Sequence, residues 1–249
     1  MNKDLSIIIP AYNEGLLIEN TIEKVYRLAK NLGRSFELII ANDGSTDDTF
    51  NIVNKKLRVY KELRMVSNKI NEGRGSVLSK AFMAANGAYQ IYLDADLAID
   101  LELVSKFIKA LDDSADIVIG SKHMHGAEIE YPPLRRIFSK SYALLVRLLL
   151  GSSIKDHQCG FKGIKKQVAR KIIPKVKDKR WSWDTELLVK AQWDGYKIVE
   201  LPAKVVNVYG RESKVHLIKD VKRMGIGLLK LCIERASYKK QQILSLTFT

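Results

Sequence analysis

The sequence is poor in cysteine and in long apolar runs. Cys159 and Cys232 are the two cysteines among 249 residues. They are too few for a disulfide framework or a cysteine-ligated zinc site, which favours a reducing compartment. Residues 1–10 lack the basic segment and apolar run of a signal sequence. No stretch approaches the roughly 18 uncharged residues of a membrane-spanning helix. We therefore expect a soluble or peripheral protein of the cytoplasm.

Two common nucleotide-binding signatures are also missing. No Gly-x-Gly-x-x-Gly follows the first apolar run, which disfavours a dinucleotide fold. The Gly-x-x-x-x-Gly-Lys-Ser/Thr of a phosphate loop is absent as well, which disfavours ATP hydrolysis of that type.

What the chain has in excess is positive charge. Its 42 Lys and Arg stand against 28 Asp and Glu, a formal net charge of +14. A basic balance of this size indicates an anionic partner, such as a nucleic acid, a phosphorylated ligand or an acidic membrane surface. The apolar content of 46% is enough for a sizeable core in one large domain, or one domain with an appendage.

Short apolar runs alternate with helical patterns in the first half of the chain. This alternation predicts an α/β fold, a mostly parallel sheet with helices on both faces. The expected strands are residues 5–9, 36–41, 63–66, 89–93 and 116–120, and the expected helices are 18–32, one opening at 46–48, and 74–86. The second half predicts basic amphipathic helices at 134–150 and 215–236, a helix at 183–194, and short strands near 197–200 and 204–208.

Two carboxylates, Asp94 and Asp96, follow the strand expected at 89–93. The carboxyl edge of an open α/β sheet is where ligands bind. Two acidic side chains at this spacing suit a hard divalent cation, which can neutralise a diphosphate. The alternative is a helix N-cap, because the following residues could begin a helix.

Polar or glycine-rich loops occur at three further places near the same edge. They are residues 11–15, 42–45 and 71–75. Each alone reads as a turn or a helix cap, but their joint occurrence in this order is not explained by turns. Together they offer carboxylates for ribose, an aromatic ring, a basic group for phosphate and a metal site, which is the inventory for a nucleotide diphosphate.

These motifs resemble the inverting GT-A glycosyltransferases of family two. The resemblance is carried by Ile-Ile-Pro-Ala-Tyr-Asn-Glu, Asn-Asp-Gly-Ser-Thr-Asp, Asn-Glu-Gly-Arg-Gly and Asp-Ala-Asp. Gln-Cys-Gly-Phe-Lys at 158–162 and Arg-Trp-Ser-Trp-Asp-Thr-Glu at 180–186 resemble the dolichyl-phosphate glucosyltransferase branch; the mannosyltransferase branch more often has Ser-Gly-Phe-Arg. The resemblance spans roughly 4–215. It implies a catalytic domain at 1–214, with a Rossmann-like nucleotide half (1–121) and an acceptor half (122–214), and a C-terminal amphipathic helix and tail at 215–249.

The resemblance implies a role for each matching residue on the donor side. Asp94 and Asp96 would hold the nucleotide and a Mg²⁺ or Mn²⁺ ion, with Asp96 the closer, catalytic ligand. Ala98 stands where the mannosyl branch often has Gln, so water is expected to complete the ion's coordination shell. The remaining nucleotide-sugar contacts implied are Pro10, Ala11, Tyr12, Glu14, Asp43, Arg74 and Ala95.

On the acceptor side, basic residues are expected around a lipid phosphate. Lys122 stands in a Gly-Ser-Lys motif that resembles the family's Gly-Ser-Arg. Arg136 and Lys140 lie beside the apolar stripe of the helix at 134–150, a pattern that suits a phosphate on a lipid tail. Arg211 and Lys214 belong to a hairpin expected to close over both substrates, where Arg211 would stabilise charge on the leaving diphosphate. A basic amphipathic helix such as 134–150 suits an anionic membrane surface. The alternative is an ordinary amphipathic helix packed on the core.

Asp184 stands where relatives with hydroxyl acceptors carry a general base. An acceptor phosphate is already ionised and needs none, so Asp184 is either a catalytic or positioning residue or a helix N-cap.

The resulting hypothesis is an inverting, metal-dependent hexosyltransferase acting on dolichyl or polyprenyl phosphate, peripheral on the cytoplasmic face of a membrane. UDP-glucose is the first expected donor and GDP-mannose the second. A same-fold alternative transfers to a sugar hydroxyl of a glycolipid or polysaccharide. A nucleic-acid-binding protein is the alternative of another class, but no reader motif supports a nucleic-acid partner.

Overall fold

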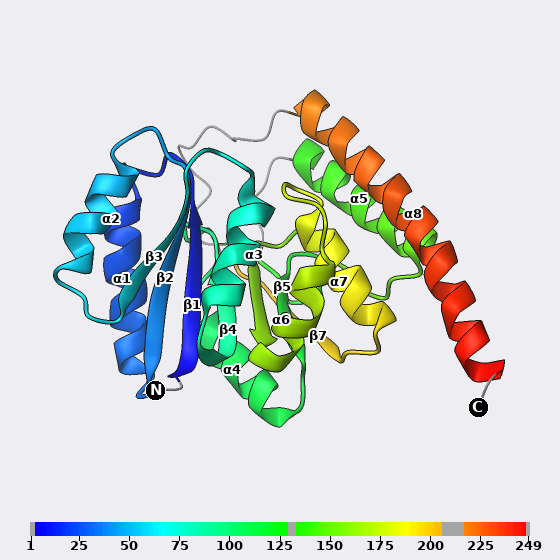
Figure 1. The fold of residues 1–249 in the computed structure, drawn as a ribbon, viewed down its shortest axis with the longest axis horizontal. Helices are drawn as coiled ribbons and strands as arrows, with labels where there is room; N and C mark the ends of the chain where they lie inside the picture. The colour runs from blue at the N-terminus through cyan, green and yellow to red at the C-terminus, as the bar shows by residue number, and fades with distance from the viewer. Residues whose placement is uncertain (1–2, 129–132, 206–216, 248–249) are drawn as a thin grey trace.

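The computed structural model describes residues 3–128, 133–205 and 217–247, and it forms a layered α/β fold (Figure 1). A seven-stranded sheet has the order β3-β2-β1-β4-β6-β5-β7. Its strands are β1 (Lys3–Ala11), β2 (Phe36–Asp43), β3 (Leu63–Asn68), β4 (Gly87–Leu93), β5 (Ile117–Ser121), β6 (Phe161–Lys165) and β7 (Ile198–Pro202). Only β6 runs against its neighbours β4 and β5; the other pairings are parallel. The predicted mostly parallel sheet is confirmed.

Helices cover both faces of the sheet because the central strands are apolar on both sides. Ile7 and Ile9 point into the core under α1 (Ile18–Asn31), α2 (Thr49–Leu57) and α4 (Leu103–Asp113). Ile8, between them, points to the opposite core. That core is closed by α3 (Arg74–Ala84), α6 (Lys166–Ile172), which a short 3₁₀ turn at Ile173–Lys175 extends, and α7 (Trp183–Trp193).

Two long helices pack on one another at the outer edge of the molecule (Figure 1). They are α5 (Pro133–Leu150) and α8 (Leu217–Thr247). Val146 of α5 and Leu228 and Leu231 of α8 form a third apolar cluster with Val189 of α7. This cluster joins the outer helices to the element that carries Asp184. No helix within the described ranges combines the length and apolar character needed to cross a membrane.

Several sequence predictions differ from the structure. The helix-cap alternative for Asp94 and Asp96 is wrong, because α4 begins only at Leu103. Residues 204–205 form isolated bridges rather than a strand, and 206–208 lie outside the described residues. The helix α8 extends beyond the predicted end at 236. Sequence reasoning also missed β6, α4 and α6; β6 mixes lysines and a glycine into five residues, which blurs its period.

Candidate functional site

The carboxyl ends of β1 to β4 bring the predicted donor residues to one edge of the sheet. Ala11 pairs in register with Asn42, and Asp43 pairs with Asn68. Pro10 and Ala11 are buried at the end of β1, while Tyr12 and Glu14 are half-buried in the loop that follows. The four predicted loops therefore meet where parallel strands end, as expected for a ligand-binding edge.

Hydrogen bonds lock the first loop to the second. Asn13, with a left-handed φ of 53°, accepts a bond from the Thr46 amide at 2.8 Å. The amide of Glu14 donates to the Thr49 hydroxyl at 2.8 Å, and the Gly15 amide donates to Asp47 at 2.9 Å. These contacts fix the backbone around Tyr12 and Glu14, whose contact with a nucleotide sugar stays a prediction.

Asp43 is buried and holds the third loop in place. Its carboxylate accepts hydrogen bonds from the Asn68 side chain at 2.7 Å, from the Glu72 amide at 3.0 Å and from the Gly73 amide at 2.9 Å. Gly73 has a φ of +113°, and a Cβ there would lie 2.3 Å from the Lys179 carbonyl oxygen. Asp43 thus sets the position from which Arg74 begins α3; its contact with a nucleoside stays a prediction.

Asp94 and Asp96 follow β4 directly, with Ala95 buried between them. The side chain of Asp94 is 44% exposed, and its Oδ1 lies 2.7 Å from Nη2 of Arg74. Asp96 Oδ1 accepts a hydrogen bond from the Ala98 amide at 3.2 Å. No group of three or more His, Cys, Asp or Glu side chains suited to a metal occurs in the part of the chain that the structure describes. Two hard carboxylates at an accessible edge fit a divalent ion whose remaining ligands are water and phosphate oxygens.

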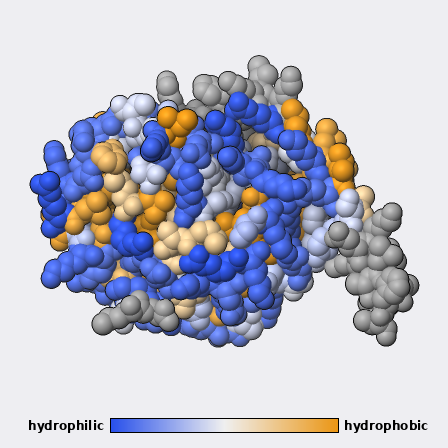
Figure 2. All heavy atoms as spheres, viewed as in Figure 1, coloured by the Kyte–Doolittle hydropathy of each residue, from blue (hydrophilic) through white to orange (hydrophobic). Residues whose placement is uncertain are grey.

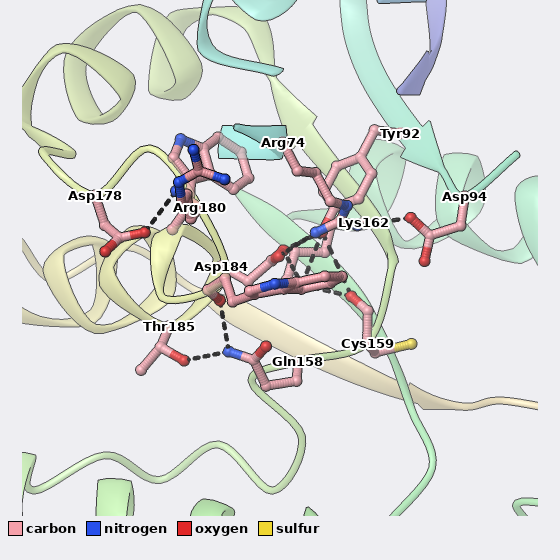
Figure 3. A network of polar contacts seen from close by, with 12 residues as sticks. Arg74, Tyr92, Asp94, Gln158, Cys159, Lys162, Asp178, Arg180, Asp184 and Thr185 are labelled. Atoms are coloured by element: carbon pink, nitrogen blue, oxygen red, sulfur yellow. Dashed lines mark hydrogen bonds and ion pairs between the residues drawn. The ribbon is translucent and has the colours of Figure 1, made fainter. Parts of the chain in front are cut away.

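Arg74 links Asp94 to Asp184 of α7 (Figure 3). Its Nη1 lies 2.5 Å from Asp184 Oδ2, while Nη2 holds Asp94. Close packing brings the two helices together, since a Cβ at Gly75 would lie 2.6 Å from Cβ of Trp183. Burial opposes the charge on Arg74, but Asp94 and Asp184 outweigh it and raise the pKa of Arg74 well above its usual value.

Behind Arg74, two further residues hold Asp184, and sequence reasoning assigned neither of them. Lys162 of β6 is fully buried, and its ammonium donates to Asp184 Oδ1 at 2.6 Å and to the Tyr92 hydroxyl at 3.0 Å. It also donates to the Cys159 carbonyl. The Tyr92 hydroxyl donates in turn to Asp184. No sequence signal pointed to Lys162, because β6 itself was not predicted; its full burial in the structure indicates the network, since lysine is almost never fully buried unpaired.

The environment of Asp184 keeps its carboxylate charged. Burial favours the neutral acid, but Lys162 and Arg74 outweigh it and hold the pKa of Asp184 below its ordinary value. The N-cap alternative for Asp184 is wrong: Ser182 precedes the helix, and the Asp184 side chain turns inward to its ion pairs.

The predicted acceptor residues are spread more widely. Lys122, at the end of β5, forms an ion pair with buried Asp156 at 2.9 Å. Arg136 and Lys140 are exposed on α5. Next to Lys122, Nε2 of His123 lies 3.0 Å from the Ser139 hydroxyl, which ties α5 to the strand end. Arg211 and Lys214 lie outside the described residues.

Besides the buried side chains of the third cluster, α5 and α8 carry apolar side chains that face outward. Figure 2 shows apolar surface along these outer helices. At least 44% of each of the following residues is exposed: Ile137, Phe138, Leu144, Leu145, Leu148, Leu149, Ile226, Leu229 and Ile233. The inner faces of α5 and α8 pack as an ordinary amphipathic helix would, but their outer faces leave apolar side chains exposed.

Comparison with known proteins identifies the family. Residues 6–173 match the family described as glycosyl transferase family 2. The chain is 34% identical over 230 residues to the glycosyltransferase AglD of Haloferax volcanii, covering 91% of this chain and 36% of that protein. It is 31% identical over 245 residues to a dolichyl-phosphate β-glucosyltransferase of Saccharomyces cerevisiae, covering 90% and 73%. A dolichol-phosphate mannosyltransferase of Pyrococcus furiosus is 27% identical, covering 80% and 55%.

The chain therefore belongs to glycosyltransferase family 2. A solved structure confirms the GT-A fold. It is a glucosyl-3-phosphoglycerate synthase from Mycobacterium tuberculosis in complex with Mn²⁺, UDP-glucose and phosphoglyceric acid, which matches with a TM-score of 0.69 at 18% identity. The match covers 92% of this chain and 80% of that one. The chain spans about a third of the length of the archaeal relative, AglD.

Proposed function

We propose that this glycosyltransferase moves a hexose from a nucleotide sugar to dolichyl or polyprenyl phosphate, with inversion at the sugar. UDP-glucose is the proposed donor and GDP-mannose the second candidate. Relatives named as dolichyl-phosphate β-glucosyltransferases support the glucose donor, and the archaeal mannosyltransferase supports the alternative. The acceptor proposal depends on the chemistry of Asp184.

The observation that carries the proposal is the charge environment of Asp184. Its two oxygens accept bonds from Lys162, Tyr92 and Arg74. A carboxylate paired with two cations is a weak base, because protonation would break both ion pairs. A hydroxyl acceptor needs a base to take its proton, whereas an ionised phosphate does not. The site is therefore better suited to a phosphate acceptor than to a sugar hydroxyl.

On the donor side, Asp94 and Asp96 would hold Mg²⁺ or Mn²⁺, an ion that neutralises the diphosphate when bound. The buried end of β1 and the locked loop with Tyr12 and Glu14 would bind the nucleoside. Arg74 adds a fixed positive charge beside the diphosphate, where it stabilises the charge that develops as the sugar leaves.

The lipid acceptor accounts for the outer helices. Arg136 and Lys140 lie on α5 beside exposed apolar residues such as Ile137 and Phe138. A phosphate on a lipid tail needs both a basic contact and an apolar surface close to the bilayer. We propose that α5 and α8 rest on an anionic membrane face, with Lys122, Arg136, Lys140, Arg211 and Lys214 around the acceptor phosphate.

The direct test is transfer of radiolabelled sugar from a panel of nucleotide sugars into an organic-extractable polyprenyl phosphate. Label in the lipid phase from UDP-glucose or GDP-mannose supports the proposal and identifies the donor. Label that enters only a glycolipid or polysaccharide hydroxyl favours the same-fold alternative. Salt-dependent binding to DNA or RNA that survives loss of Asp94 and Asp96, with no transfer, favours a nucleic-acid-binding protein.

The variant Asp184→Asn separates the two acceptor chemistries. Removing a general base lowers a rate by roughly 10²–10⁴-fold. With a short-chain polyprenyl phosphate and saturating donor, we expect the variant to lose less than about a hundredfold. A dead variant that still folds and binds both substrates would overturn the phosphate-acceptor mechanism. Thermal unfolding must accompany the assay, since breaking a buried ion pair costs about 3–5 kcal/mol of stability.

A further inference from the structure

A chain of four alternating charges runs from the buried β6 strand to the accessible sheet edge (Figure 3). It begins at Lys162, passes to Asp184, then to Arg74, and ends at Asp94. The four residues come from β6, α7, α3 and the loop after β4. Exposure rises along the chain, from 0% for the Lys162 side chain to 44% for Asp94. Only the Asp94 end is open to a ligand.

We propose that Lys162, with Tyr92, is a positioning residue for the donor diphosphate, acting through Asp184 on Arg74. This inference rests on the proposed function, since it concerns the diphosphate of the nucleotide sugar. Lys162 lies behind Asp184, and its ammonium donates to Asp184, to Tyr92 and to the Cys159 carbonyl. Its role is to fix Asp184 and to balance its charge.

The charge balance explains why a buried lysine matters at this place. Two cations, Lys162 and Arg74, neutralise two anions, Asp184 and Asp94. Without Lys162, Asp184 would depend on Arg74 alone, and the site would gain a net negative charge. In a poorly solvated site that charge is weakly screened and repels a diphosphate. With Lys162 present, Arg74 can shift its charge from Asp94 to the incoming phosphates.

Tyr92 orients the Asp184 carboxylate, whose charge Lys162 balances. Its hydroxyl accepts from Lys162 and donates to Asp184, which fixes the direction of the carboxylate. Both cations lie close to its ring: the centroid is 5.3 Å from the Arg74 guanidinium carbon and 5.4 Å from the Lys162 ammonium. Phe82 and Trp183 hold the ring edge-to-face at 5.9 and 6.1 Å. Packing of this kind leaves the hydroxyl a single position.

The test measures binding of UDP and GDP in the presence of Mn²⁺ by calorimetry, together with the corresponding monophosphates. For Lys162→Met we expect diphosphate affinity to fall about tenfold or more, with a smaller loss for the monophosphate. A general packing defect would weaken both ligands alike. Lys162→Arg keeps the charge and should restore most of the diphosphate preference.

Lys190 provides the matched control. It is also buried on α7, but it pairs with Glu186 and Glu234 rather than with Asp184. Lys190→Met should keep the wild-type ratio of diphosphate to monophosphate affinity, whatever its effect on the melting temperature. An equal loss of ratio in Lys190→Met would overturn the specific role of Lys162.

Tyr92→Phe keeps the test decisive if Lys162→Met does not fold. It removes only the hydroxyl, and we expect a several-fold loss of diphosphate affinity and of the transfer rate at saturating donor. Unchanged diphosphate binding in a folded Lys162→Met, or in Tyr92→Phe, would overturn the positioning role. A wild-type protein that binds neither diphosphate would instead overturn the proposed function, so the two failures are distinct.

Discussion

Gly160 lies directly against the carboxylate of Asp94: a Cβ at position 160 would be 1.8 Å from Asp94 Oδ2. Gly160 also contacts the backbone of Asp94, because the Asp94 amide donates to the Gly160 carbonyl at 3.1 Å. A side chain at position 160 would therefore occupy the space that the Asp94 carboxylate fills. The Cys-Gly-Phe-Lys motif thus supports the site twice, through Gly160 at Asp94 and through Lys162 at Asp184.

Gly160→Ala should consequently impair transfer while the protein stays folded. The methyl group must displace the Asp94 side chain from its ion pair with Arg74, and the half-exposed carboxylate can then turn toward solvent. A displacement of about 1 Å at a reacting centre costs roughly a hundredfold in rate. Steady-state kinetics and thermal unfolding of the same preparation check this. Gly225→Ala on α8, where a Cβ meets nothing within 4 Å, should behave as wild type. Wild-type kinetics in Gly160→Ala would contradict the proposed role of Asp94.

Metal dependence is the second prediction. If Asp94 and Asp96 hold the ion, EDTA should stop transfer, and Mg²⁺ or Mn²⁺ should restore it. Asp96→Ala should lower the rate by roughly a hundredfold or more, because an ion opposite a diphosphate contributes several kcal/mol. Asp113→Ala, an exposed carboxylate at the end of α4, serves as the control for charge loss. Full activity in EDTA would exclude the metal role.

The third prediction concerns the outer helices. Leu148 of α5 and Ile233 of α8 are 69% and 71% exposed. Burying such side chains in a bilayer contributes about 1.5 kcal/mol or more each. The double variant Leu148→Gln/Ile233→Gln should reduce co-sedimentation with anionic liposomes at least roughly tenfold, without lowering the melting temperature. Val59→Gln, 67% exposed after α2, should have no effect on liposome binding.

The same liposome assay, repeated at different salt concentrations and with neutral vesicles, tests the electrostatic part of membrane binding. Wild-type binding should weaken at high salt and on neutral vesicles, because screening shortens the reach of the basic residues. Equal binding to neutral and anionic vesicles would count against the electrostatic part of the proposal. Absence of binding to either would remove the membrane role of α5 and α8.

The fourth prediction is a pH dependence of stability from His157. This buried ring contacts the Ser152 hydroxyl at 2.8 Å through Nε2, while Nδ1 has no hydrogen-bond partner. Burial, with the nearby charge of Lys162, lowers the pKa of His157 from 6.5 to about 4. Between about pH 6.5 and pH 4, His157 is therefore protonated in the unfolded chain but neutral in the folded protein. Stability from this group is complete above about pH 7 and falls as the pH is lowered toward 4.

Urea unfolding at pH 7.5 and pH 5 measures the effect. Between these values, His157 should account for a loss of about 2 kcal/mol in the free energy of unfolding. His157→Gln should lose that much less between the two pH values than the wild type does. His125→Gln, at an exposed position, should keep the wild-type difference. The same pH dependence in His157→Gln would show that another group is responsible.

The sequence by itself determined the donor edge. Alternating apolar runs and turn residues are local signals, and they predicted β1 to β5 and the loops that carry Tyr12, Asp43 and Asp94. Parallel strands have their carboxyl ends at the same edge of a sheet. The sequence alone was therefore enough to predict that these loops lie close together. The family followed from the same motifs.

Only the tertiary structure decided what Asp184 and Lys162 do. Arg74 and Asp184 are 110 positions apart, and Lys162 reaches Asp184 from β6, which enters the sheet in reverse between β4 and β5. No local periodicity encodes that insertion. A carboxylate near the start of a helix has the same sequence signature whether it caps the helix or turns into the core. The difference is made by Lys162 and Tyr92, which stabilise a buried charge that neither helix propensity nor spacing can reveal.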